Sequence, residues 1–221
     1  MKALVIAAGM GTRLKELTTN QNKCSLLVAG KPMITHVIDP LLDNGINDIY
    51  VTTGHHADTV KEALGDKAEY IHNPIYHATG VLVSTWVARE RLAGEEFIWS
   101  TADNLFHPEV LKDFVASPGE ILVAVKKKDY YKDRDVRTHI TDGKIQSFDQ
   151  ESPSANAEFS CMAKFSPEAS QAFFNTIQNY LSNQQTKVRF IDSLNSLREQ
   201  GFTLTPFFIP EGKHAEVDTP E

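Results

Sequence analysis

The chain has 221 residues, of which 41% are hydrophobic and 23% are charged. This composition is typical of a globular domain with a substantial core, and it argues against disorder and against a membrane-spanning role. The formal net charge of −7 argues against a nucleic-acid partner, because phosphate backbones bind to a basic face. The apolar run at the N-terminus is too short for a signal peptide or a bilayer span, so we expect a cytoplasmic protein with no membrane partner. Cys24 and Cys161 are too few for a disulfide framework or a tetrahedral metal site.

The first half of the chain alternates apolar runs of strand length with segments of helical period. This alternation predicts βα units and a mostly parallel sheet. Gly45 and Gly65 end two of the helices, and Pro40 is expected to kink the first. In chain order we predict strand 2–8, helix 33–42, strand 48–53, helix 57–64, strand 68–72, helix 81–92 and strand 96–100.

The second half has a different texture, with strand-like segments separated by polar turns such as Asp142-Gly143. This pattern predicts a more mixed or antiparallel half. Ser166-Pro167-Glu168 is a strong helix start, with a capping hydroxyl, proline in the first turn and an early acid. We predict strands 120–126, 136–141, 144–148, 158–165 and 203–208, with a helix after Ser166, a second helix at 191–200, and an acidic tail.

A glycine-rich loop follows the first strand, with the sequence Ala7-Ala8-Gly9-Met10-Gly11-Thr12-Arg13-Leu14. Glycines there let the backbone approach a ligand, and a turn of exposed N–H groups forms an anion cradle. Arg13, Lys15 and Lys23 add concentrated positive charge in a chain that is acidic overall. The loop therefore predicts binding of a polyphosphate.

Two familiar phosphate-binding motifs do not fit this loop. A P-loop needs Gly-Lys followed by Ser or Thr, and the dinucleotide fingerprint needs a small residue where Leu14 stands. The fingerprint also needs an acid at the end of the second strand, which here reads Thr53-Gly54-His55. An isolated Gly-x-Gly can also serve only as a tight strand-to-helix turn, so the loop alone leaves that alternative open.

The loop with its downstream lysine resembles the signature of the nucleotidyltransferase (NTP-transferase) superfamily, whose members join an NTP to a phosphorylated small molecule. The family pattern is Gly-x-Gly-Thr/Ser-Arg followed by Pro-Lys; here Asn22 replaces the proline and Lys23 is kept. The segment Gly30-Lys31-Pro32-Met33-Ile34 resembles the family's start of its first helix. The resemblance implies an α/β fold of the Rossmann-like three-layer nucleotide-diphospho-sugar transferase type, with a mixed, mostly parallel central sheet.

Two aspartates extend the resemblance along nearly the whole chain. Asp103, after a buried strand, resembles the family's metal-binding aspartate, and Asp218 in Glu216-Val217-Asp218-Thr219-Pro220 resembles the second. Each lies at the end of an element, where an α/β sheet places its binding crevice, and Mg²⁺ suits carboxylates plus phosphate oxygens. Asp103 could instead cap the helix near Pro108, although His107 is the closer cap, and Asp218 could belong to a frayed tail.

The resemblance implies transfer of a nucleotidyl group with loss of pyrophosphate. Arg13 and Lys23 would be catalytic, and Asp103 and Asp218 would bind Mg²⁺. The nucleotide would contact Ala7, Ala8, Gly9, Gly11, Thr12, Arg13 and Gly80. We expect a single domain, with residues 1–107 as the nucleotide-binding half and residues 108–221 as the acceptor-binding half.

The acceptor is indicated by a resemblance to phosphocholine-type cytidylyltransferases, carried by Asn73-Pro74-Ile75-Tyr76 and Ser84. A choline-like cation is held by aromatic faces and acids, which makes Tyr76, Trp86 and Glu158 candidate acceptor contacts. The partners would then be CTP and phosphocholine or a related phosphonate. A sugar-1-phosphate nucleotidyltransferase and a nucleotide-sensing module remain alternatives, and a homodimer stays open. Lys126, Lys127 and Lys128 are expected at a solvated strand end.

Overall fold

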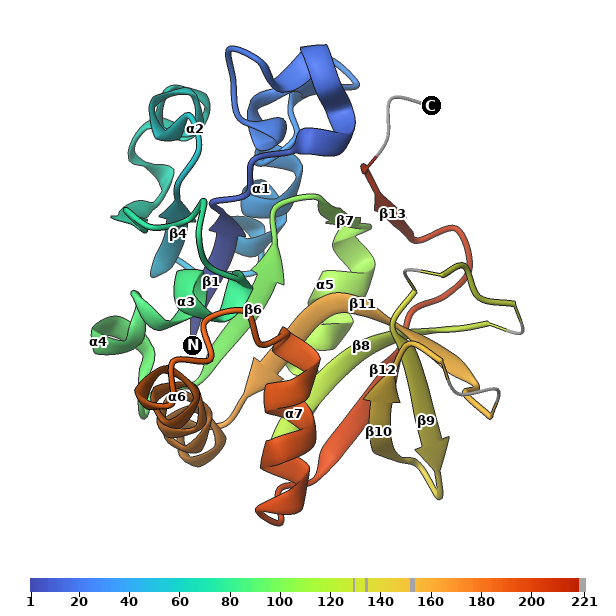
Figure 1. The fold of residues 1–221 in the computed structure, drawn as a ribbon. Helices are drawn as coiled ribbons and strands as arrows, with labels where there is room; N and C mark the ends of the chain where they lie inside the picture. Colours follow the sequence, from blue (N-terminus) through green and yellow to red (C-terminus); the bar gives the residue numbers. More distant parts are fainter. Residues whose placement is uncertain (129, 134, 152–153, 219–221) are drawn as a thin grey trace.

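A computed structural model describes residues 1–128, 130–133, 135–151 and 154–218. In the described part a nine-stranded sheet has the order β10-β9-β11-β6-β1-β4-β5, and β8 pairs with β11 and with β12 (Figure 1). Its strands are β1 (Lys2–Ala7), β4 (Ile49–Thr53), β5 (Glu69–His72), β6 (Phe97–Thr101), β8 (Ile121–Lys127), β9 (Arg137–Thr141), β10 (Lys144–Asp149), β11 (Ala157–Phe165) and β12 (Leu204–Phe208).

The two halves of the sheet differ as predicted. Strands β6, β1, β4 and β5 run parallel, whereas β11 is antiparallel to β6 and to β8. Two short pairs lie outside the sheet: β2 (Leu27–Val28) with β3 (Lys31–Pro32), and β7 (Asn104–Phe106) with β13 (His214–Glu216). The last pair was not predicted, because residues 215–221 read as an acidic tail. The fold is the expected α/β fold with a mixed, mostly parallel sheet.

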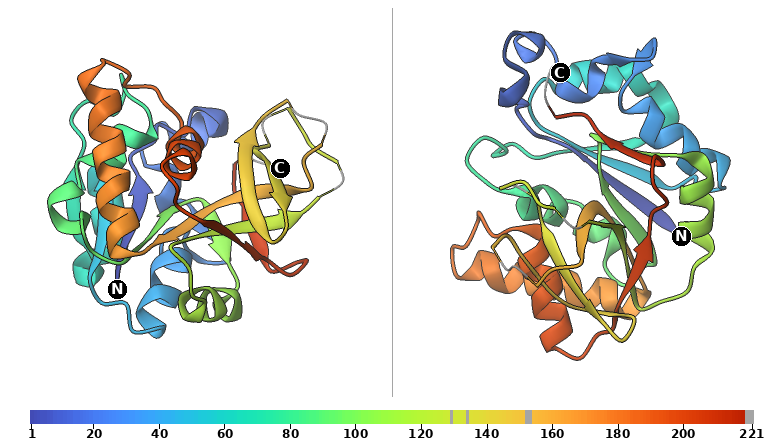
Figure 2. Two further views of the ribbon diagram at one scale, coloured as in Figure 1. Left: turned by 90° about the horizontal axis from the view of Figure 1, so that it is seen from below. Right: turned by 90° about the vertical axis from the view of Figure 1, so that its right-hand side faces the viewer.

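Helices cover both faces of the sheet (Figure 2). The α-helices are α1 (Thr35–Asp43), α2 (Ala57–Leu64), α3 (Val81–Trp86), α4 (Arg89–Leu92), α5 (Pro108–Ala116), α6 (Pro167–Ser182) and α7 (Phe190–Glu199). The 3₁₀ helices are η1 (Thr12–Thr18), η2 (Lys23–Ser25) and η3 (Gly65–Lys67). Among the described residues, no helix combines the length and the apolar character needed to cross a bilayer.

Two hydrophobic cores lie on opposite faces of the sheet because side chains alternate along each strand. In β1, Leu4 packs into the core shared with α3, α6 and α7. Ala3 and Val5 pack into the core shared with α1, α2 and α5. At β1 and β6 the sheet is thus buried on both sides, which leaves the ends of these strands for a binding site.

Most predicted elements agree with the structure within two residues at each end. Ser166 caps α6 as expected, with its hydroxyl accepting a hydrogen bond from the N–H of Ala169. The single helix predicted for residues 81–92 is wrong, because the chain forms α3 and α4 with a break between them. Ala88, at φ −91° and ψ 3°, leaves the helical region, and its N–H bonds to Thr85 in a tighter turn.

Candidate active site

The glycine loop leaves the carboxyl end of β1 and turns sharply at Gly11. This residue has φ 63° and ψ 27°, the left-handed conformation that glycine adopts without strain. A Cβ at this position would also lie 3.0 Å from side-chain atoms of Lys23 and of Thr18. Gly11 is therefore required both by the backbone angle and by the close packing of Lys23 against the loop.

Gly9 differs from Gly11 because the protein itself does not require glycine at this position. Its φ lies outside the left-handed range, and a Cβ built on it would meet no atom within 4 Å. The space beside it belongs to a cavity that the loop lines. The absence of a side chain at Gly9 thus keeps the backbone open to a ligand, as the sequence predicts for a phosphate cradle.

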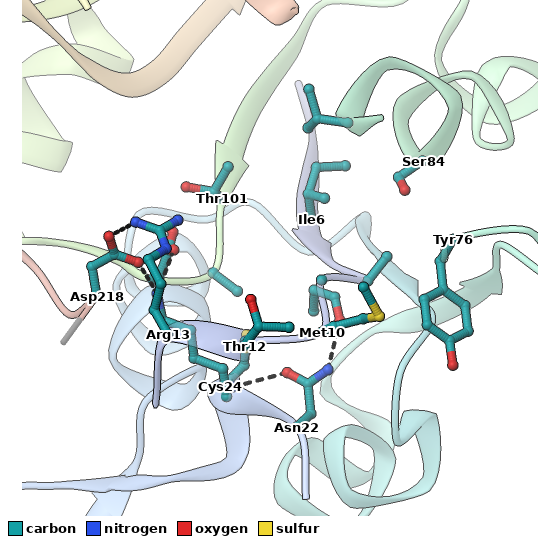
Figure 3. Close-up of a pocket in the computed structure, with 18 of the residues that line it drawn as sticks. Ile6, Met10, Thr12, Arg13, Asn22, Cys24, Tyr76, Ser84, Thr101 and Asp218 are labelled. Carbon is teal, nitrogen blue, oxygen red and sulfur yellow. Dashed lines mark hydrogen bonds and ion pairs between the residues drawn. The ribbon is translucent and has the colours of Figure 1, made fainter. Parts of the chain in front are cut away.

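Lys23 connects the two aspartates that the sequence analysis proposes as metal ligands. Its Nζ donates to Oδ2 of Asp103 at 2.9 Å and to Oδ1 of Asp218 at 3.0 Å. Only 8% of Lys23 is exposed, so the ammonium lies in a largely buried position. Arg13 forms an ion pair with the other carboxylate oxygen of Asp218 (Figure 3). Both cations therefore converge on Asp218.

The meeting of Asp103 and Asp218 is explained by the pairing of β7 with β13. Asn104 lies opposite Glu216 in this antiparallel pair, and the N–H of Val217 bonds to the carbonyl of Asp103 at 3.0 Å. Asp218 is 7% exposed, so it is no part of a frayed tail. The remainder of that motif, Thr219 and Pro220, lies outside the described residues. The cap of α5 is His107 and not Asp103, because Nδ1 of His107 accepts a hydrogen bond from the N–H of Glu109.

Asp103 is held in its ionised form. Burial by itself would raise the pKa of this carboxyl, but the Lys23 ammonium and hydrogen bonds from Lys23, Thr101 and Asn104 hold it below its ordinary value. The amide of Asn104 also donates to Oγ1 of Thr101 at 2.8 Å, and this bond orients the amide. A carboxylate that stays charged near neutral pH suits a cation-binding role.

A third carboxylate completes an acidic cluster. Glu216, Asp103 and Asp218 each offer an oxygen within 4.8 Å of the others. These are the hard oxygen donors that divalent cations such as Mg²⁺ prefer, so the residues fit a metal. Sequence reasoning did not single out Glu216 as a ligand. Its position two residues before Asp218, in the same acidic segment of the sequence, is the signal that could have found it.

A cavity of about 360 Å³ adjoins this cluster. All the residues predicted to contact the nucleotide line it: Ala7, Ala8, Gly9, Gly11, Thr12, Arg13 and Gly80. Lys23, Asp103 and Asp218 border the same space, together with Tyr76, Ser84 and Thr101. The structure thus brings the glycine loop, the two cations and the two aspartates around one cavity at the carboxyl ends of β1 and β6.

The three residues predicted to contact the acceptor are separated in the structure. Tyr76 lines the cavity on the side of the glycine loop, whereas Trp86 and Glu158 are outside its lining residues. The guanidinium of Arg89 stacks over the Trp86 ring at 3.7 Å from its centroid. Trp86 also packs against the core shared with α6.

Glu158 is held by two lysines on and next to β8. Its carboxylate lies 3.3 Å from Nζ of Lys126 and 3.0 Å from Nζ of Lys128, and Lys128 also pairs with Asp135. The expectation that these lysines form a solvated strand end is therefore wrong for Lys126 and Lys128, while Lys127 is exposed. Glu158 and Asp135 together offset the two charges of Lys126 and Lys128, so this group as a whole does not attract an additional cation.

Gly54 follows β4, where the dinucleotide fingerprint would need an acid, and it has a structural role at the site. A Cβ on it would lie 2.6 Å from the carbonyl oxygen of Ala8 and 2.7 Å from the Tyr76 ring. The end of β4 can therefore pack against the glycine loop only because residue 54 has no side chain.

Comparison with known proteins is consistent with this geometry. Residues 3–192 match the model of the MobA-like NTP transferase domain. The chain is 33% identical over 132 residues to CMP-5'-(3-aminopropyl)phosphonate synthase of Streptomyces rubellomurinus, covering 58% of this chain and 21% of that protein. It is 34% identical over 116 residues to choline-phosphate cytidylyltransferase of Streptococcus pneumoniae, covering 51% of this chain and 49% of that protein.

Solved structures share the fold over the whole chain. The inositol-1-phosphate CTP transferase of T. maritima superposes with a TM-score of 0.84 at 18% identity, covering 99% of this chain and 89% of that one. The CTP:phosphocholine cytidylyltransferase of Streptococcus pneumoniae superposes with a TM-score of 0.81 at 21% identity, covering 99% and 94%. The sequence matches to the two curated relatives thus span half or less of those proteins, while the fold extends over nearly all of this chain.

Proposed function

The chain belongs to the MobA-like NTP transferase family, and from this we propose that it is a Mg²⁺-dependent cytidylyltransferase. It would join CTP to a small phosphorylated acceptor and release pyrophosphate. Phosphocholine would give a CDP-linked product, and a related phosphonate would give a CMP-linked product. The observation that carries the proposal is the convergence of Lys23 and Arg13 on Asp103 and Asp218 beside the glycine loop. The choice of CTP rests on the names of the cytidylyltransferases to which the chain is similar.

The reaction would be the attack of an acceptor phosphate oxygen on the α-phosphorus of the nucleotide. A new P–O bond forms there, the bond between the α-phosphorus and its bridging oxygen breaks, and pyrophosphate leaves with that electron pair. The nucleophile is already an anion, so no side chain has to remove a proton from it. The protein's contribution is then to align the two phosphates and to offset their negative charge.

Lys23 and Arg13 have the positions needed for that contribution. An ammonium group has three N–H donors, and the two bonds of Lys23 to Asp103 and Asp218 leave one for a phosphate oxygen. The Arg13 side chain is 60% exposed and borders the cavity, so its guanidinium can contact the leaving phosphates. Asp218 orients both cations, because it pairs with each of them.

The acidic cluster would hold the metal. Asp103 and Asp218, with Glu216 beside them, would bind Mg²⁺, which supplies positive charge to the phosphate oxygens when it is bound. Asp103 would remain available for this role because its pKa is lowered.

Two sets of contacts argue against a choline-like acceptor, for which a sugar-1-phosphate is the alternative. A choline cation needs an uncompensated acid or an open aromatic face, but Glu158 is paired with Lys126 and Lys128, and Arg89 covers Trp86. These contacts argue against two of the three predicted choline contacts and leave Tyr76 as the candidate that lines the cavity.

Pyrophosphate release should be measured with CTP, UTP, GTP and dTTP, each combined with phosphocholine, 2-aminoethylphosphonate or glucose-1-phosphate. We expect the highest kcat/KM with CTP and one of the first two acceptors. A preference for glucose-1-phosphate would instead support the sugar-phosphate enzyme. Binding of a nucleotide without turnover on any pair would contradict the proposal and support a nucleotide-sensing module.

A further inference from the structure

Asn22 precedes Lys23 and lies at the base of the glycine loop. It is fully buried, with 0% of its surface exposed, although it is a polar residue. Its φ of −68° and ψ of 145° place it just before the short helix η2, which begins at Lys23. A buried amide is tolerated only when its polar atoms have partners, so its contacts show what it holds in place.

The side chain of Asn22 joins three segments around the site, and Figure 3 shows its bond to Cys24. Its Nδ2 donates to the carbonyl of Ala7 at 3.0 Å and to the carbonyl of His55 at 2.6 Å. Its Oδ1 accepts from the N–H of Cys24 at 2.9 Å. Both N–H donors and the carbonyl of the amide are therefore used, and each bond goes to the backbone.

The backbone of Asn22 is fixed as well. Its N–H donates to Oγ1 of Thr59 at 3.0 Å, and the hydroxyl of Ser25 donates to the same oxygen at 3.0 Å. Thr59 lies in α2, so the turn that carries Lys23 is attached to this helix from both of its ends. The three side-chain bonds and these two contacts leave the turn little freedom to move.

The anchoring points coincide with the reaction site. Ala7 is the last residue of β1, from which the glycine loop departs, and His55 follows β4 next to Gly54. Holding the Lys23 turn to both strand ends fixes its ammonium relative to the loop that would cradle the phosphates. We propose that Asn22 is a positioning residue for nucleotidyl transfer, which holds Lys23 between Asp103 and Asp218; this inference rests on the proposed function.

The backbone angle of Asn22 suggests a way to separate position from general stability. Proline locks φ near about −65°, which is close to the −68° of Asn22. Asn22→Pro therefore keeps the direction in which the chain enters η2, while it removes the side-chain bonds and also the backbone N–H bond to Thr59. Asn22→Ala removes only the side-chain bonds and leaves φ free. A proline variant more active than the alanine variant, in spite of the additional bond that it loses, would support the placing of Lys23 through the backbone angle.

The test is steady-state pyrophosphate release together with direct NTP binding by calorimetry, on wild type, Asn22→Ala and Asn22→Pro. We expect Asn22→Ala to lower kcat tenfold or more while the Kd for NTP changes less than about threefold. We expect Asn22→Pro to recover at least a third of the wild-type kcat. Asn195→Ala is the matched control, because Asn195 also makes two side-chain bonds to distant backbone, at Phe148, away from the cavity.

Asn195→Ala should lower the melting temperature without changing kcat, which measures what a purely structural asparagine contributes. A wild-type kcat in Asn22→Ala would overturn the inference, as would a loss of NTP affinity as large as the loss of kcat. If wild type itself turns over no nucleotide pair, the proposed function fails, and the two failures are thereby distinguished.

Discussion

The N–H of Val217 donates a hydrogen bond of 3.0 Å to the carbonyl of Asp103. This contact continues the pairing of β13 with β7 by one step, and it places Asp218 next to Asp103. Two carboxylates this close would repel each other, and Lys23 lies between them with a bond to each. The charges of Asp103, Lys23 and Asp218 are therefore coupled, so a change to one of them should alter the others.

Asp103→Asn should abolish turnover while the fold is retained. The substitution keeps the shape of the side chain but removes the negative charge that Lys23 contacts and that a metal would need. We expect kcat to fall by about 10² or more, as when other preorganised charges are removed from an active site. Pyrophosphate release and thermal unfolding would be compared with Asp39→Asn, which breaks a surface pair with Lys67. Unchanged activity would exclude Asp103 from the metal role.

Lys23→Ala should lower kcat more than it weakens NTP binding. Its ammonium would contact the reacting phosphates most strongly in the transition state, and such a contact affects kcat in particular. Single-turnover rates and the Kd for NTP would be measured for this variant and for a control, Lys67→Ala, which removes a surface ion pair with Asp39. If the Kd rises and the chemical rate does not change, Lys23 serves in binding only.

Arg13→Ala should strengthen metal binding in the absence of nucleotide. Arg13 pairs with Asp218, so its positive charge competes with a cation for that carboxylate. Binding of Mn²⁺ followed by electron paramagnetic resonance should therefore show a lower Kd for the variant than for wild type. The same variant should bind NTP more weakly. Arg91→Ala, which removes an exposed pair with Glu69, should change neither quantity.

Gly9→Ala should affect ligand binding and Gly54→Ala should affect stability, although both change the surroundings of one loop. A Cβ at Gly9 meets open space, so the melting temperature should stay near that of wild type while NTP affinity falls. A Cβ at Gly54 would lie 2.6 Å from the Ala8 carbonyl, so the variant should lose about 1–3 kcal/mol of stability. Unfolding in urea and NTP titrations would measure both effects. Equal NTP affinity in wild type and Gly9→Ala would mean that no ligand approaches this backbone.

Asp135 should contribute stability that is lost in acid. Burial would raise the pKa of its carboxyl, but bonds from Lys128 and from the N–H of Lys132 outweigh this and lower it. The ordinary pKa of this carboxyl is 3.8, and above that pH the carboxylate stabilises the fold in full. The stabilisation disappears as the pH falls through the lowered pKa of the folded state.

The stability difference between wild type and Asp135→Asn should therefore be constant near neutral pH and should shrink below about pH 4. Urea unfolding at a series of pH values would measure it. A difference that does not depend on pH would show that the charge of Asp135 is not the source of its stabilisation.

The sequence alone determined the order of the elements and the character of the glycine loop. Alternating side chains define β1 and β6, and a capping serine with proline defines the start of α6, because these signals lie within a few neighbouring residues. Local motifs and the family resemblance singled out Arg13, Lys23, Asp103 and Asp218 as candidates, and the structure brings these four around one cavity. The break after α3 was missed because the apolar period continues through it.

Only the tertiary structure decided which side chains meet. Glu216 joins the aspartates because β13 pairs with β7, and that register depends on packing between segments far apart in the sequence. The negative charge of Glu158 is offset by Lys126 and Lys128, on and next to the neighbouring strand β8, and the residues around Glu158 in the sequence do not reveal this. In the sequence, Asn22 only replaces the proline of the family's Pro-Lys pattern. In the structure, its buried bonds to Ala7 and His55 link segments that only the folded sheet brings together. Local patterns specify elements, whereas the partners of a buried polar group depend on where those elements pack.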